Sequence, residues 1–169
     1  MKKTVLILKK AAIVMMVLSI ALGMNLPGVE NASAATKGYY FTYAKKSVTM
    51  GSDATSFINA AGKPSKKKAE KSCAYDGKDI TRKYKNFILY TYTNSNSSSA
   101  TEYVDGITFL TKKVSTKEGI KIGSSEDDVI EAYGSAKAKY GVYTYTKGKT
   151  KLQISVEDGV VTQIRYVLK

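Results

Sequence analysis

The 169-residue sequence predicts an α+β fold in which two tandem repeats, each a helix followed by three antiparallel strands, form one sheet with both helices on one face. Two observations predict this fold. Residues 48–62 recur as residues 120–134, with Gly, Ser, Ile, Ala and a closing Gly at matching positions. After each copy, apolar and polar residues alternate with period two, which is typical of strands. We therefore expect a first repeat over residues 35–112 and a second over residues 113–169, joined in one compact domain.

The N-terminal residues predict a signal peptide rather than part of the fold. Four lysines lie within the first ten residues, and an apolar run follows over residues 11–24. Small residues at 31–35 offer a cleavage site, so we expect residues 1–34 to be removed after Ala34. A retained membrane anchor is the alternative, but a spanning helix needs about 20 apolar residues. We expect the protein to be secreted or associated with the cell envelope, with membrane contact only before cleavage.

Each copy of the repeat has the composition of a strand end, a turn and a short helix. A glycine follows the strand end, hydroxyl residues can cap the helix, and carboxylates fall in the first helical turn of the second copy. In that copy a capping box joins either Ser124 with Asp127 or Ser125 with Asp128. We expect each helix to run for about ten residues and to end at the closing glycine in a left-handed C-cap.

Seven segments have strand composition. The expected strands are residues 39–43, 80–84, 87–93 and 101–110 before the second helix, and residues 140–146, 151–156 and 160–168 after it. Asp158-Gly159 predicts a tight hairpin turn between the last two. A lysine-rich connection of 18 residues follows Gly62, and residues 94–100 form a loop of low complexity.

The composition excludes several kinds of chemistry. The chain has no histidine and a single cysteine, but 13 tyrosines. Imidazole bases, imidazole metal ligands, internal disulfides and cysteine-rich zinc sites are therefore excluded. Carboxylate pairs of the glycosidase type remain an alternative, but the carboxylate clusters already have explanations as a helix start and a turn. We expect a protein that is not an enzyme, with no catalytic residues, no metal site and no cofactor.

The single cysteine, Cys73, has three interpretations. It is a buried apolar side chain, the site of an intermolecular disulfide or modification, or a nucleophile activated by nearby lysines such as Lys71. The sequence leaves all three open.

Tyrosine is the residue type that most favours a binding function. An antiparallel sheet with helices on one face leaves its other face open. Tyrosine is enriched at protein interfaces because it supplies contact area and a hydroxyl on a stiff side chain. We expect Tyr90, Tyr92, Tyr143 and Tyr145 to form a protein-binding or inhibitory face for an extracytoplasmic protein. The alternative is that these tyrosines pack under the helices or pair across strands.

Basic residues point to a second kind of partner. Four lysines and one glutamate leave with residues 1–34, so 23 basic and 13 acidic residues remain and the net charge is about +10. Such a charge attracts anionic polymers of the cell envelope, whereas nucleic acid lies in another compartment. The candidate residues are Lys66, Lys67, Lys68, Lys71, Lys112 and Lys113. The alternative is that dispersed lysines serve only to keep the domain in solution.

The tandem unit also carries a family resemblance. Its apolar-x-apolar-Gly-Ser start, its short helix ending in Ala-x-Gly and its strand meander resemble the fold shared by the β-lactamase inhibitor protein and the BamE-type outer-membrane lipoproteins. The span from Ser72 to Ser124, which begins Ser-Cys-Ala-Tyr-Asp-Gly-Lys-Asp, also looks like a group of small secreted proteins of Gram-positive gut bacteria with no assigned function. The resemblance covers roughly residues 38–169. It implies a sheet lined with aromatic residues that docks on a target protein.

Overall fold

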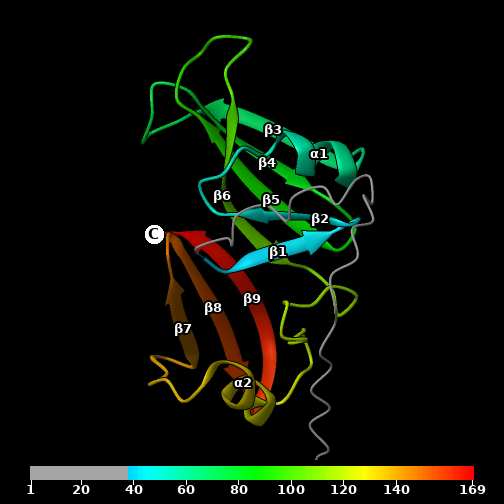
Figure 1. Cartoon of the computed structure of the whole chain (residues 1–169), viewed down its shortest axis with the longest axis vertical. Coiled ribbons are helices and arrows are strands. Elements are labelled where there is room, and N and C mark those ends of the chain that lie inside the picture. Colours follow the sequence, from blue (N-terminus) through cyan, green and yellow to red (C-terminus); the bar gives the residue numbers. More distant parts are fainter. Residues whose placement is uncertain (1–37) are drawn as a thin grey trace, which may run out of the picture. The chain divides into compact units, whose positions relative to one another are not determined.

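The computed structural model describes residues 38–169, so the predicted signal peptide lies outside the described residues. The described residues belong to one compact unit, Ser33–Lys169. Seven antiparallel strands form one sheet in the order β3-β4-β5-β6-β9-β8-β7, and a hairpin of β1 and β2 crosses it (Figure 1). The elements in chain order are β1 (Tyr40–Tyr43), β2 (Lys46–Thr49), α1 (Thr55–Ala61), β3 (Lys66–Lys71), β4 (Lys78–Lys83), β5 (Phe87–Thr93), β6 (Glu102–Phe109), α2 (Glu126–Tyr133), β7 (Val142–Lys147), β8 (Thr150–Glu157) and β9 (Val160–Leu168). Neither helix of residues 38–169 has the length and apolar character needed to cross a bilayer.

The predicted fold class is wrong, because the fold is dominated by antiparallel sheet. Strands account for 46% and helices for 11% of the described residues. The helices have seven and eight residues instead of about ten. The two halves of the chain are also not equivalent, since the part before α2 supplies four strands of the large sheet and the whole β1–β2 hairpin, whereas the part after it supplies three strands. The fold is therefore β-rich and does not consist of two helix-plus-three-strand repeats.

β3 was not predicted from the sequence, and it occupies six of the 18 residues of the predicted lysine-rich connection. All six of its residues are exposed, so no apolar alternation marks it. β3 pairs only with β4 and forms one edge of the sheet. Lysines are common on such edges because they discourage pairing with another chain. An edge strand of this kind has no buried face, and sequence periodicity cannot reveal it.

The core lies on one face of the seven-stranded sheet, under the β1–β2 hairpin and the helices. Phe41 of β1 is 1% exposed, and its ring centroid lies 5.2 Å from that of Phe87 and 5.1 Å from that of Phe109. Phe57 of α1 packs on the same side, 6.0 Å from Phe87. Val129 of α2 is fully buried in the same cluster. The hairpin and both helices therefore cover the same face of the sheet.

α2 begins at a capping box and ends at a glycine. The Ser125 hydroxyl accepts a hydrogen bond from the Asp128 N–H at 3.1 Å, and the Asp128 carboxylate accepts one from the Ser125 N–H at 3.0 Å. The second of the two predicted pairings is thus confirmed. Gly134, with φ 82° and ψ 166°, does not form the predicted left-handed C-cap. It adopts an extended backbone of positive φ that is essentially restricted to glycine, and the glycine after α1 is similar.

Replacing Ser125 with alanine is expected to lower the free energy of unfolding by about 1 kcal/mol. The N–H of Asp128 loses its acceptor, and an eight-residue helix has few other local interactions to hold its first turn. Urea unfolding followed by circular dichroism measures the change. Ser125→Thr is the matched control, since threonine also caps helices. Equal stability of Ser125→Ala and the wild type would contradict a role for this cap.

A buried ion pair joins β4 to β6 on the core side of the sheet. Arg82 is 4% exposed, and its guanidinium donates to both carboxylate oxygens of Glu102 at 2.6 and 2.7 Å. The Thr91 hydroxyl donates to the same carboxylate at 2.9 Å. Burial on its own raises the pKa of Glu102, but the hydrogen bonds from Arg82 and Thr91 and the charge of Arg82 outweigh it and hold the pKa below its ordinary value. Glu102 therefore stays ionised at neutral pH.

Tyr84, two residues beyond Arg82, has a buried hydroxyl with no hydrogen-bond partner in the described part of the chain. Its ring stacks on Phe87 with the centroids 4.8 Å apart, so the ring itself is well packed. Tyr84→Phe is expected to leave the free energy of unfolding unchanged or to raise it by up to about 1 kcal/mol, because a buried hydroxyl without a partner is destabilising. Denaturant unfolding measures this change. A clear loss of stability in Tyr84→Phe would show that the hydroxyl is satisfied in solution.

Candidate functional site

The face of the seven-stranded sheet opposite the core, here called the open face, carries the candidate site. In β5 the odd-numbered residues from Phe87 to Thr93 are buried, so Tyr90 and Tyr92 point to the opposite side. The hairpin and both helices cover the core face. Within residues 38–169 they leave the open face without a covering helix. Tyr90 and Tyr92 therefore lie where the sequence predicted a binding face.

Tyr92 is the centre of a stack of three tyrosines on the open face. The ring of Tyr75, from the loop between β3 and β4, lies parallel to that of Tyr92 with the centroids 4.1 Å apart and the planes at 12°. Tyr103 of β6 is paired with Tyr92 across the strands, and its ring centroid lies 5.7 Å away. Tyr75 is 37% exposed and the other two are half-buried. The stack therefore presents rigid aromatic surface to solvent.

Tyr90 extends this surface next to a glycine. Gly106 of β6 lies directly across from Tyr90, and a side chain at that position would contact the Tyr90 ring. A Cβ at Gly106 would lie only 2.9 Å from the Tyr166 carbonyl oxygen, so the glycine permits the close approach of β9, while its contact with the Tyr90 ring at 3.7 Å would be an ordinary one. Together, Tyr75, Tyr90, Tyr92 and Tyr103 form what we call the tyrosine face.

Charged side chains lie beside the tyrosine face. A β-bulge between β5 and β6 inserts Asp105 as an extra residue next to Gly106. Burial and the negative charge of Asp79 raise the pKa of Asp105, while Arg165 acts in the opposite direction. The pKa of Tyr92 is raised chiefly by burial, and to a smaller extent by Tyr75 and Asp105. Asp105 thus carries its charge in an unfavourable environment, which a cation from a partner would improve.

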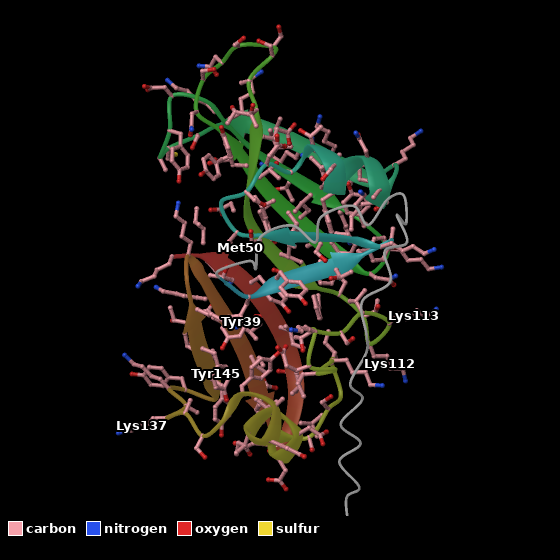
Figure 2. The ribbon with its side chains drawn as sticks, in the orientation of Figure 1. Tyr39, Met50, Lys112, Lys113, Lys137 and Tyr145 are labelled. Carbon is pink, nitrogen blue, oxygen red and sulfur yellow. The ribbon has the colours of Figure 1, made fainter. Side chains whose placement is uncertain are left out.

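The other two predicted tyrosines do not lie on this face. Tyr143 and Tyr145 of β7 are each 7% exposed and belong to the core. The Tyr143 hydroxyl donates to the Glu126 carboxylate, and the Tyr145 hydroxyl donates to the Gly134 carbonyl at 3.1 Å, so both fasten α2 to the sheet. Tyr145 is labelled in Figure 2. The prediction that these two residues form part of an exposed face is wrong, because β7 directs its tyrosines inward.

The six candidate lysines do not form one patch. Lys66, Lys67, Lys68 and Lys71 all belong to β3 and are exposed. Lys112 and Lys113 lie on the loop after β6, below β3 and β4 in the view of Figure 2, and two strands separate β3 from β6. Lys68 makes an ion pair with Glu70 at 2.8 Å, with both side chains largely exposed. The structure therefore places four of the six lysines on one edge strand, with Lys66 and Lys68 on one face and Lys67 and Lys71 on the other, and leaves the pair after β6 apart.

Tyr75, Tyr103 and Asp105 were not among the site residues predicted from the sequence. Tyr103 lies on a predicted strand, but its position opposite Tyr92 depends on the register of β5 and β6, which cannot be read from the sequence. Tyr75 belongs to a loop, where no periodicity exists. Cys73 of the same loop is exposed and free, so it is not the buried apolar side chain that was one of its three interpretations.

No group of three or more cysteine, aspartate or glutamate side chains in residues 38–169 is placed to hold a metal ion. Comparison of the chain with family models, with curated proteins and with solved structures found no match.

Proposed function

We propose that the protein is a secreted, non-enzymatic binding module that docks on another extracytoplasmic protein through the tyrosine face. The observation that carries this proposal is the stack of Tyr75, Tyr92 and Tyr103 on the sheet face that no helix of the described residues covers. Aromatic residues that gather on one exposed surface commonly mark an interaction site.

The geometry favours binding because little conformational entropy remains to be lost. Tyr90, Tyr92 and Tyr103 are on strands that are paired on both sides, and Tyr75 is stacked on Tyr92. Side chains that are already ordered lose less freedom when a partner binds. The tyrosine face therefore offers hydroxyl groups and aromatic area at low entropic cost.

The charges beside the tyrosine face indicate which kind of side chain the partner would place there. Asp79 and Asp105 lie close enough for the charge of one to raise the pKa of the other. A lysine or arginine from the partner would relieve this repulsion and form charge-assisted hydrogen bonds. The contact surface of the partner is accordingly expected to combine apolar area with a basic side chain.

Affinity capture with matched variants tests the proposal. Wild type, Tyr92→Ala/Tyr103→Ala and Tyr143→Phe are immobilised in equal amounts and exposed to an extract of extracytoplasmic proteins. The proposal predicts a protein that wild type and Tyr143→Phe retain equally and that the double variant retains at least about tenfold less. Direct binding of that protein, once purified, then completes the test. Retained proteins that are the same for all three baits would refute a role for the tyrosine face.

The β3–β4 hairpin favours a second candidate function, which is binding of anionic polymers of the cell envelope. Residues 63–85 contain nine basic and three acidic residues, a net charge of +6. Binding that rests on this charge is screened by salt, since the Debye length falls from about 10 Å at 0.1 M to about 3 Å at 1 M. Retention of the protein on purified wall polymer should therefore be lost in molar salt. Retention that molar salt leaves unchanged would contradict this function.

A further inference from the structure

A pocket of about 230 Å³ lies between the β3–β4 hairpin and the serine-rich loop that follows β5. The strand side consists of Lys67, Ala69, Lys78 and Ile80, which share one face of the hairpin because their positions alternate along paired strands. The loop side consists of Thr93, Ser95, Ser97, Ser98 and Ala100, and Glu102 completes the wall. The pocket thus combines two ammonium groups with four hydroxyl groups.

Hydrogen bonds hold the loop against the hairpin. The Thr93 hydroxyl accepts a hydrogen bond from the backbone N–H of Lys78 and donates one to the Ser95 carbonyl, both at 2.9 Å. The Asn96 side chain donates to the Asp76 carbonyl, also at 2.9 Å. Two of these bonds connect the first part of the loop to the end of the hairpin at Asp76 and Lys78, so this side of the pocket is formed before any ligand binds.

The pairing of β3 with β4 brings positive charges close together, and only Arg82 among the residues of the like-charged pairs has a carboxylate partner within residues 38–169. Three of the six cross-strand pairs place two cations directly opposite each other: Lys66 with Lys83, Lys67 with Arg82 and Lys71 with Lys78. Like charges at directly opposite positions destabilise a sheet. Lys67, Lys71 and Lys78 lie on the face of the hairpin that lines the pocket, so an anion bound there would offset their repulsion, whereas Lys66 and Lys83 lie on the other face.

The one carboxylate of the pocket wall is already engaged. Both oxygens of Glu102 accept hydrogen bonds from Arg82, and one of them also accepts from Thr91. Within residues 38–169 the two ion pairs use Arg82 and Lys68, so neither Lys67 nor Lys78 is paired with a carboxylate there. Lys67 lies near enough to Glu102 for its charge to lower the pKa of that carboxyl, but it makes no ion pair with it, so both ammonium groups can contact a ligand.

We propose that this pocket binds a phosphoryl group, either as free phosphate or as the phosphodiester of an anionic polymer. A phosphoryl group has several acceptor oxygens, which suit lysines on one side and the hydroxyls of Ser95, Ser97 and Ser98 on the other, since the Thr93 hydroxyl already donates to the Ser95 carbonyl. The volume equals that of about eight water molecules at about 30 Å³ each, which admits a phosphoryl group with part of an esterified alcohol. The proposal deepens the second candidate function and does not involve the tyrosine face.

Two-dimensional amide NMR of the protein at constant ionic strength tests the pocket. One series uses inorganic phosphate and another uses a synthetic oligomer of glycerol phosphate. Saturable shifts are expected at Ala69, Ser95, Ser97 and Ser98 with at least one of the two probes. Saturation with both probes identifies a single phosphoryl group as sufficient, whereas saturation with the oligomer alone assigns the pocket to polymer. The absence of saturable shifts with either probe would overturn the proposal.

Two double variants, each of which removes two positive charges, distinguish binding in the pocket from nonspecific electrostatic attraction to the protein. Lys67→Gln/Lys78→Gln is expected to weaken binding of the saturating probe at least about tenfold, whereas Lys112→Gln/Lys113→Gln should change it less than about twofold. Equal weakening by both variants would refute the pocket. Both lysines of the pocket are exposed, so the first variant should fold, and its unfolding midpoint should rise as repulsion is relieved.

Two outcomes distinguish failure of the pocket proposal from failure of the second candidate function. Salt-sensitive retention on wall polymer that Lys67→Gln/Lys78→Gln leaves intact would refute the pocket and keep the function. Saturable phosphate shifts without retention on wall polymer would keep the pocket and refute the function.

Discussion

Replacing Glu102 with alanine is expected to lower the free energy of unfolding by about 3 kcal/mol, at the low end of what removal of one partner from a buried ion pair costs. The Arg82 side chain is 5% exposed and that of Glu102 is 22% exposed, so the variant leaves a guanidinium in the interior with only Thr91 as a partner. Partial exposure of the carboxylate keeps the expected loss near the lower limit. Urea unfolding at neutral pH measures it.

The double variant Arg82→Met/Glu102→Leu is the control for this prediction. It removes both charges, so most of the lost stability should return. A double variant as unstable as Glu102→Ala would show that the loss comes from packing and not from an unpaired charge.

The same ion pair predicts how stability depends on pH. Because the folded pKa of Glu102 lies below its ordinary value of about 4.3, the stability from the pair is complete above that value and is lost as the pH falls through the lower folded pKa. Glu102→Ala should therefore lose less stability than the wild type on acidification below about pH 4. Equal acid sensitivity of the two proteins would contradict this assignment.

Local patterns in the sequence located several elements well. Strands β5, β8 and β9 were predictable because their alternation is local. Asp158 and Gly159 have φ values of 51° and 74° and form the predicted two-residue turn. Ala44 and Lys45 also have positive φ in the turn between β1 and β2, but these residue types give no turn signal. Edge strand β3 also gave no strand signal, because it buries no side chain and its sequence therefore shows no apolar alternation.

The candidate site could be only half predicted, because a strand's composition does not specify which side faces the core. β5 and β7 both contain Tyr-Thr-Tyr-Thr, yet β5 directs its tyrosines to the open face and β7 directs them into the core. Threonine is buried in β5 next to Arg82 and Glu102, whereas in β7 the inward tyrosines reach Glu126 of α2 and the glycine that follows this helix. These partners are distant in sequence, so only the fold reveals the choice.

Tyr92→Ala is expected to weaken binding of the proposed protein partner about 30-fold, which corresponds to about 2 kcal/mol. Tyr92 contacts both Tyr75 and Tyr103, so its loss removes the centre of the stack and frees Tyr75 from its packing partner. Because Tyr92 lies on the face opposite the core, the variant should remain folded. Titration calorimetry with the purified partner measures the change. Tyr143→Phe, altered on the core side, should bind within about twofold of the wild type.

The most direct test of the tyrosine face is the nitration of individual tyrosines in the free protein and in the complex, read by mass spectrometry. Tyr140, which is 92% exposed and precedes β7, provides an internal control. The proposed docking predicts that modification of Tyr75, Tyr92 and Tyr103 falls when the partner binds, while that of Tyr140 is unchanged. Unchanged modification of all three tyrosines in the complex would contradict the proposed binding face.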